Sequence, residues 1–147
     1  MTTDANRAAG WATAAVLAGR LIFVGVFIMA VGFKLVDING TAAYIAAAGF
    51  PLPELLAWIA VGFELVLIAG LVTGAFFSEV ALLAAAYVLF LGFAFHGPSH
   101  WEGNQAEFGF FVDHFSFAAG LLFAAAHGPG RVLAMRCGRM RQRGFGG

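Results

Sequence analysis

The sequence predicts an all-α membrane protein: a four-transmembrane-helix bundle with a short interfacial helix between helices 1 and 2. Composition is the first observation, since the 147-residue chain is 61% hydrophobic, only 11% charged, and has a mean hydropathy of +0.88. Soluble domains are about 45–50% apolar and about 25% charged. A globule of this size buries only about 70% of its unfolded surface. The composition therefore excludes an ordinary soluble enzyme, a disordered chain and a nucleic-acid-binding protein.

Four long apolar runs are the second observation, and they cover residues 11–33, 55–73, about 78–95 and 108–126. Each run is close to the roughly 17–25 residues that a helix needs to cross a bilayer. Their backbone must be helical, because lipid offers it no hydrogen-bond partner. The first run is too long for a signal-peptide core and carries Arg20 in its middle, so we expect a retained span.

The segments between the runs are the third observation. Residues 41–48 predict a short helix that ends at Gly49 before Pro51, a typical stop signal, and that lies at the headgroup level. Residues 74–77 predict a tight turn, and residues 96–107 a polar loop. We expect one membrane domain over residues 11–130, flanked by a tail at 1–10 and a basic tail at 131–147.

Basic residues predict the orientation of the chain. Arg7 and five arginines after residue 130 would share one side of the membrane, whereas the other side carries only Lys34. The excess of Lys and Arg marks the cytoplasmic side. We therefore expect a multi-pass protein of a bacterial-type cytoplasmic (inner) membrane with both termini cytoplasmic. The basic tail would serve either as a topology signal or to bind anionic lipid or a partner.

Arg20 and Glu64 are the two charges well inside the apolar runs, where each costs roughly 2.5–3.5 kcal/mol. Arg20 lies eight residues after Ala12, and Glu64 lies nine residues before Thr73 on a helix that runs the other way. At 1.5 Å per residue both are about 12–14 Å deep. We therefore expect an Arg20–Glu64 ion pair, which could be a structural clamp or a site for binding or proton transfer.

A second polar group is expected near the outer face. It comprises Lys34, His96, Asp113 and His114, with His100, Glu102 and Glu107 in the adjoining loop. Asp113 and His114 point about 100° apart on a helix. Asp113 is therefore the better partner for Lys34, and His114 could stack beneath Glu107. These histidines have the residue types of a metal or haem ligand, but nothing fixes their geometry, so we expect no metal site.

Small residues predict close helix packing. Gly19, Gly25 and Gly32 recur along the first run, and Gly70 and Gly74 form a GxxxG pattern in the second. The single Cys137 excludes an intrachain disulfide.

Several motifs together resemble the DoxX family over about residues 14–131. They are Gly32-Phe33-Lys34-Leu35, the segment 46–54 (AAAGFPLPE), Glu64, His96 and Gly128-Pro129-Gly130. The resemblance implies a compact four-helix membrane bundle. Many members carry Lys-Asn early in the fourth span, where this chain has Asp113-His114, and an Arg at the second turn, where it has Ser78-Glu79.

The resemblance implies a role in a membrane oxidoreductase or respiratory-type complex, because relatives include subunits linked to thiosulfate:quinone oxidoreduction and to thiol stress. We expect an accessory or anchoring subunit that contacts lipid and other membrane subunits, needs no cofactor and is not catalytic by itself. A quinone-binding subunit is the alternative, with Arg20 on a quinone carbonyl, Glu64 relaying its proton and Tyr87 nearby. A small-molecule carrier or sensor is a further alternative. Family membership alone does not decide between them.

Overall fold

The computed structural model describes the backbone of residues 2–135 and the side chains from Gly10 to Met135, and this part of the chain is all-helical, as predicted. Four long helices are joined by short connections. The elements are α1 (Thr2–Val36), α2 (Ile38–Ala47), α3 (Pro53–Thr73), α4 (Phe77–His96), the 3₁₀ turn η1 (Pro98–His100) and α5 (Gln105–His127).

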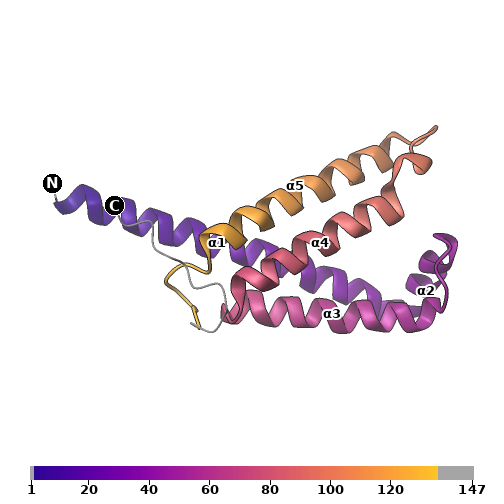
Figure 1. The fold of residues 1–147 in the computed structure, drawn as a ribbon, viewed down its shortest axis with the longest axis horizontal. Helices are drawn as coiled ribbons and strands as arrows, with labels where there is room; N and C mark the ends of the chain where they lie inside the picture. The colour runs from indigo at the N-terminus through magenta and orange to yellow at the C-terminus, as the bar shows by residue number, and fades with distance from the viewer. Residues whose placement is uncertain (1, 136–147) are drawn as a thin grey trace.

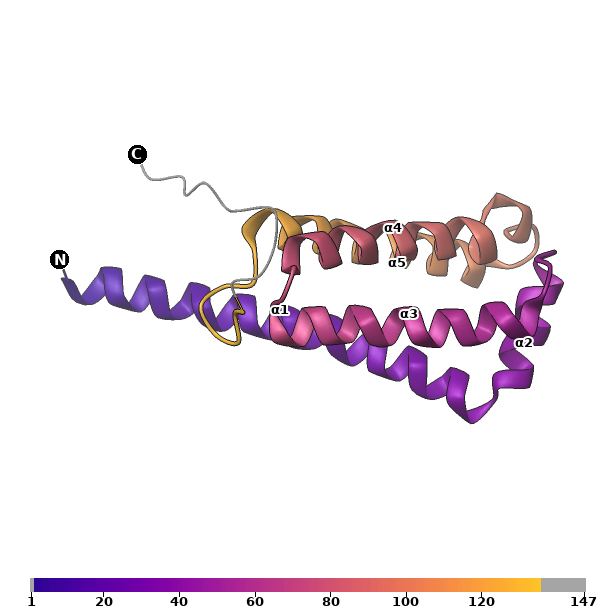
Figure 2. The ribbon, with the colours of Figure 1, turned by 60° about the horizontal axis from the view of Figure 1, so that its bottom comes forward.

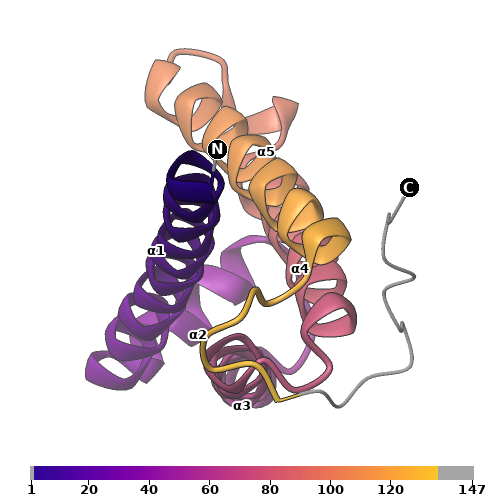
Figure 3. The same ribbon diagram turned by 90° about the vertical axis from the view of Figure 1, so that its left-hand side faces the viewer.

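The four long helices run up and down in two layers. Figures 1 and 2 show α4 and α5 side by side above α1 and α3, with α2 lying across one end. We call this end the α2 end, and the opposite one the Arg20 end. Viewed from the Arg20 end, the helices surround a common interior, and the first part of α1 extends beyond the others (Figures 1 and 3).

Four helices are long and apolar enough to cross a membrane, which confirms the four predicted spans. They are Gly10–Val36, Pro53–Thr73, Phe77–His100 and Gln105–His127. The predicted bounds differ from these by a few residues at most. The helix that contains the first span begins earlier, at Thr2, inside the segment expected as a tail.

Turn chemistry sets the ends of the short connections. The Asp37 side chain accepts a hydrogen bond from the Gly40 amide at 2.8 Å and caps α2. Gly49, at φ 84°, follows the end of α2, which confirms the predicted stop signal. Pro53 then occupies the first turn of α3, where its missing N–H leaves no hydrogen bond unmade.

The core is built from leucine and alanine. Leu67, Leu71 and Leu121 are fully buried against small residues such as Ala84 and Ala118. A Cβ on Gly70 would lie 2.5 Å from Cγ2 of Val80, so this glycine allows α3 and α4 to approach closely, as predicted. The three glycines of α1 are different: a Cβ on Gly19, Gly25 or Gly32 would meet no atom within 4 Å. The expected packing role of these three is wrong in the described part of the chain.

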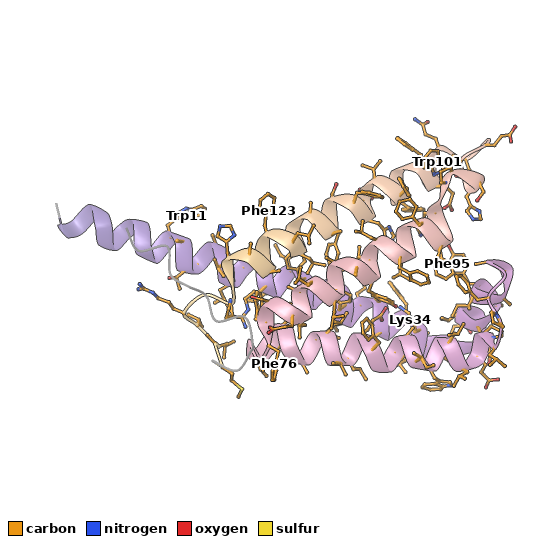
Figure 4. All side chains as sticks on the ribbon, in the orientation of Figure 1. Trp11, Lys34, Phe76, Phe95, Trp101 and Phe123 are labelled. Carbon is orange, nitrogen blue, oxygen red and sulfur yellow. The ribbon has the colours of Figure 1, made fainter. Side chains whose placement is uncertain are left out.

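Large apolar side chains cover the outside of the bundle. Exposed Phe, Leu, Ile and Val side chains occur on all four long helices, which suits contact with lipid tails. Trp11 and Trp101 lie toward opposite ends of the molecule (Figure 4). Tryptophan is enriched at the two membrane interfaces, so their separation agrees with a bundle that spans the bilayer.

Candidate functional site

Lys34, Glu64 and Tyr87 form a polar cluster inside the bundle. Lys34 Nζ binds both carboxylate oxygens of Glu64, at 2.9 and 3.0 Å. The Tyr87 hydroxyl donates to Glu64 Oε1 at 2.8 Å. One residue comes from each of α1, α3 and α4, and Figure 4 shows Lys34 in the interior between the two layers. The cluster therefore ties three helices together at one level.

The helices explain why these side chains meet. Glu64 lies on the buried stripe of α3, which also holds Val61 and Leu67, and it is only 1% exposed. Lys34 lies in the last turn of α1, where a cation is favoured by the helix dipole. Its side chain points back along α1, since Nζ also approaches the Ala30 carbonyl at 3.4 Å. This direction brings the ammonium group to the level of Glu64.

The structure overturns the expected Arg20–Glu64 ion pair. The Arg20 guanidinium donates to five carbonyl oxygens at 2.7–3.2 Å and contacts no carboxylate. Two of these carbonyls end α3 and three belong to the segment after α5; they are those of Leu71, Val72, Pro129, Val132 and Leu133. The guanidinium also lies 5.2 Å from the centre of the Phe77 ring. Arg20 thus joins the end of one helix to the segment that follows another.

The expected pair fails because of the depth assigned to Arg20. The sequence-based depth counts from Ala12, but α1 begins at Thr2 and extends beyond the other helices at this end. Arg20 is therefore level with the last turn of α3. Glu64 lies seven residues before Leu71, about 10 Å further along α3 at the usual rise per residue. The C-terminal carbonyls of α3 carry partial negative charge and have no partner within the helix, so they suit a cation.

The outer polar group assembles around His96. Its Nδ1 lies 2.6 Å from Glu107 Oε2, and its backbone carbonyl accepts from Trp101 Nε1 at 2.9 Å. The His114 ring packs against the His96 ring at 5.0 Å between centroids. Glu107 therefore binds His96 and not His114, whose Nδ1 lies 2.7 Å from the Phe110 carbonyl.

The expected Asp113–Lys34 pair is also wrong in the described structure. Lys34 is held by Glu64, and Asp113 is exposed with no hydrogen bond or ion pair to any described residue. His100 and Glu102 are exposed as well. The described residues contain no group of three or more His, Cys, Asp or Glu side chains that could hold a metal ion. Cys137 and the four arginines after Met135 lie outside the described residues.

Sequence reasoning gave Tyr44 no place in this outer group. Its ring stacks on Phe95 at 5.1 Å between centroids. Phe95 lies in the last turn of α4, so α2 packs against this end of α4. Although Tyr44 is 51% exposed, partial desolvation of its hydroxyl and the negative charge of Glu107 raise its pKa above the usual value. The sequence signal was available, since an aromatic residue on an interfacial helix is typical of a membrane boundary, but the partner helix could not be read from it.

A groove of about 320 Å³ lies between α1 and α5 at the Arg20 end. Its lining is mostly apolar and includes Val16, Gly19, Phe23 and Phe123, with Arg20 and His127 as polar members. The five Arg20 N–H groups face carbonyl oxygens, so none of them is free to bind a ligand in this groove.

The fold and the buried ion pair define a class of protein: a multi-pass membrane protein built as a four-helix bundle. The family model for DoxX matches residues 15–97. Inner membrane protein YphA of Escherichia coli (strain K12) is 34% identical over 121 residues, which cover 79% of this chain and 84% of that protein. The chain belongs to the DoxX family. No solved structure gives a significant match.

Proposed function

We propose that this DoxX-family protein is an accessory subunit of a membrane oxidoreductase complex and that its buried polar side chains hold the bundle together. It would reside in a bacterial inner membrane with both termini cytoplasmic. The inner-membrane location is supported by the similarity to inner membrane protein YphA. The association with an oxidoreductase rests on the family resemblance of the sequence motifs.

The observation that carries this proposal is the saturation of the buried polar groups. In the described part of the chain, every buried side-chain nitrogen or oxygen atom has a hydrogen-bond partner. Arg20 is fully bonded to backbone carbonyls, and both Glu64 oxygens are bonded to Lys34, with Tyr87 on one of them. A catalytic centre needs polar groups that are free to contact the reacting molecule. Groups already bonded to each other act as structural ties, which suits a subunit that supports the chemistry of another.

Purification from its native membrane in a mild detergent tests this proposal. We expect the tagged chain to migrate on a native gel well above its 15.4 kDa mass, together with a subunit that carries a flavin, haem or iron–sulfur absorption band. Deleting the gene should lower the activity of that complex without removing its cofactor. Migration of the chain alone, with normal oxidoreductase activity in the deletion strain, would contradict the proposal.

Quinone binding is the second candidate, and one observation favours it. The Tyr87 hydroxyl, the Glu64 carboxylate and the Lys34 ammonium are connected by short hydrogen bonds, and such a chain can pass a proton. Lys34 is 19% exposed, whereas Glu64 is 1% exposed, so the ammonium would meet a quinone carbonyl. Binding would require Lys34 to give up its long contact to the Ala30 carbonyl at 3.4 Å, whereas Arg20 would have to break bonds of 2.7–3.2 Å and therefore has no part in this version.

Binding of a short-chain ubiquinone to the purified protein tests the second candidate. We expect Lys34→Met to abolish binding and Tyr87→Phe to weaken it, because the donor to the carbonyl or its hydrogen-bonded neighbour is lost. Glu54→Gln, an exposed change at the start of α3, serves as the control. Equal binding by all four proteins would leave the cluster with a structural role only.

A further inference from the structure

Asp113 is a carboxylate on the exposed surface of a membrane-length helix. It lies eight residues after Gln105 and fourteen before His127, the two ends of α5. These separations are about 12 Å and about 21 Å along the helix axis. The apolar run begins at Phe108, five residues or about 7.5 Å before Asp113, so in a bilayer the exposed carboxylate would face the outer part of the lipid tails. Ionised side chains at this depth are unfavourable unless they are paired.

No described residue pairs with this carboxylate. Lys34 is bound by both oxygens of Glu64, and Arg20 is bound by carbonyls at the other end of the bundle. His114 is the next residue in sequence, but its Nδ1 faces the Phe110 carbonyl and its ring packs on His96. The carboxylate thus contrasts with the buried Arg20 and Glu64 groups, which are both saturated.

The surroundings of Asp113 would let another helix approach. Its exposed neighbours on α5 include Phe110 on one side and Gly109, Val112 and Ser116 on the other, and we call Asp113 together with these last three residues the Asp113 face. A Cβ on Gly109 would meet nothing within 4 Å, and the Ser116 hydroxyl is bonded to its own helix at the Val112 carbonyl. Small residues at a membrane helix surface permit close helix contact.

The position of α1 leaves this face uncovered. One turn further along α5, Phe117 packs against Phe23 and Phe27 of α1, at 5.0 and 5.8 Å between ring centroids. Toward the α2 end, the axes of α1 and α5 diverge (Figures 1 and 2). Asp113 therefore lies one turn before Phe117, toward the end of the bundle where the axes of α1 and α5 diverge.

Charge complementarity identifies what should cover the face. A two-fold dimer through α5 would bring two Asp113 carboxylates together, which is repulsive. A second copy offers no free cation at this depth within residues 10–135, because its Lys34 is already paired. A membrane helix that carries one lysine or arginine at the same depth would neutralise Asp113 and fill the space beside the small residues.

We propose that the Asp113 face binds a transmembrane helix of a partner subunit that presents one lysine or arginine at the level of Asp113. This inference rests on the proposed role as an accessory subunit and names the chemistry of the partner. The contact is a buried salt bridge between helices, and it fixes the depth and the rotation of the two subunits relative to each other.

Synthetic transmembrane helices test this inference without the native complex. The probe is a 23-residue poly-leucine helix with one lysine. The lysine lies about a third of the helix length from the end that would sit at the α2 end of the bundle. Two matched helices serve as controls. The first carries leucine in place of the lysine, and the second carries the lysine at the corresponding depth in the opposite leaflet. Each helix carries a donor fluorophore, and the full-length protein carries an acceptor fluorophore. The two are reconstituted together in phosphatidylcholine vesicles. Energy transfer between the two labels measures association.

We expect the lysine helix to associate with the wild-type protein about tenfold more strongly than either matched helix, because polar contacts between membrane helices are of this size. Asp113→Asn should remove the preference, and the exposed-loop change Glu102→Gln should retain it. Melting of Asp113→Asn in detergent should match the wild type, because the side chain has no partner in the described structure.

Equal binding of all three helices by the wild-type protein would overturn the inference. A preference that survives in Asp113→Asn would overturn it too, as would energy transfer between two copies of the protein that exceeds transfer to the lysine helix. None of these results touches the proposed function, which is tested by migration of the native complex. Loss of that complex with a retained lysine preference would instead contradict the proposed function alone.

Discussion

Three of the charged side chains in the spans, Arg20, Glu64 and Asp113, are accommodated in three different ways. Arg20 uses backbone carbonyls, Glu64 uses Lys34 and Tyr87, and Asp113 has no partner among the described residues. The first two arrangements keep a full charge inside the bundle by surrounding it with hydrogen bonds. Charge in these spans is therefore tolerated where the fold supplies bonds, and the exposed exception marks the surface where a partner is expected.

Replacing Glu64 by leucine is expected to destabilise the bundle by about 3 kcal/mol. The change leaves the Lys34 ammonium without its carboxylate, and breaking one half of a buried pair typically costs about 3–5 kcal/mol. Lys34 keeps some exposure, so the lower end of this range applies. Unfolding in mixed micelles of sodium dodecyl sulfate, followed by circular dichroism, measures the loss.

A double variant separates the charge from the packing. Glu64→Leu with Lys34→Met removes both charges, so it should recover most of the stability lost by the single change. Glu54→Leu, on an exposed position of the same helix, should change stability by less than about 0.5 kcal/mol. If the double variant were as unstable as the single one, packing around Glu64 would explain the loss and the ion pair would not.

Tyr44 gives the structure a dependence on alkaline pH. Its pKa is raised in the folded protein by partial desolvation of the hydroxyl and by Glu107, so the folded state holds the phenol proton more tightly than the unfolded state. A free tyrosine titrates near pH 10. The stability that comes from the neutral hydroxyl is therefore fully present below about pH 10 and decreases as the pH rises toward the folded-state pKa.

Absorbance at 295 nm during an alkaline titration measures this effect. The chain has two tyrosines, so in the variant Tyr87→Phe the signal comes from Tyr44 alone. We expect its midpoint above that of free tyrosine, and a lower midpoint when Glu107→Gln is added, because the neighbouring negative charge is removed. A midpoint that does not move with Glu107→Gln would place Glu107 away from α2.

At the scale of elements, the segment after α5 is held to α3 by one side chain and one amide. Arg20 binds the carbonyls of Pro129, Val132 and Leu133, and the Met135 amide donates to the Thr73 carbonyl at 3.0 Å. The chain that leaves α5 is thus attached to the end of another helix. Because Arg20 belongs to α1, three helices meet at this point.

Arg20→Lys should release this segment while keeping the charge. Lysine has three donors on one atom and cannot reach carbonyls on both sides, so we expect a loss of about 2–3 kcal/mol from several broken hydrogen bonds. Hydrogen exchange of the Met135 amide should become at least tenfold faster. Arg131→Lys, an exposed position, is the control and should exchange as the wild type does. Unchanged exchange in Arg20→Lys would show that the segment is held by other contacts.

The partners of Arg20 could not be predicted because backbone carbonyls leave no mark in a sequence. Any helix end offers such acceptors, so they do not distinguish one position from another. A carboxylate such as Glu64 is recognisable from its residue type, and sequence reasoning therefore pairs Arg20 with Glu64. The Lys34–Glu64 contact was missed for a similar reason. The side chain of Lys34 reaches back along α1, and this direction depends on a rotamer that the sequence does not specify.

At the scale of the whole molecule, the four spans and the interfacial helix could be predicted well, because apolar length is a strong signal in a membrane protein. The predicted run 55–73 and the helix Pro53–Thr73 differ by two residues at one end. What could not be predicted is how the helices pack, since the spans are apolar on most of their faces and their periodicity is weak. Packing decides which charges meet, so the residues of the candidate site were identified but not their pairing.

An even number of spans places both ends of the molecule on one side of the membrane, and from the distribution of basic residues we propose that this side is the cytoplasm. Single cysteines test the assignment in a Cys137→Ser background. Ser99→Cys lies in the exposed turn at the α2 end, and Val132→Cys lies after α5 at the Arg20 end. We expect a membrane-impermeant maleimide to label Ser99→Cys in intact spheroplasts and to label Val132→Cys only after permeabilisation. The reverse pattern would invert the molecule, and labelling of both sites from outside would contradict the four-span arrangement itself.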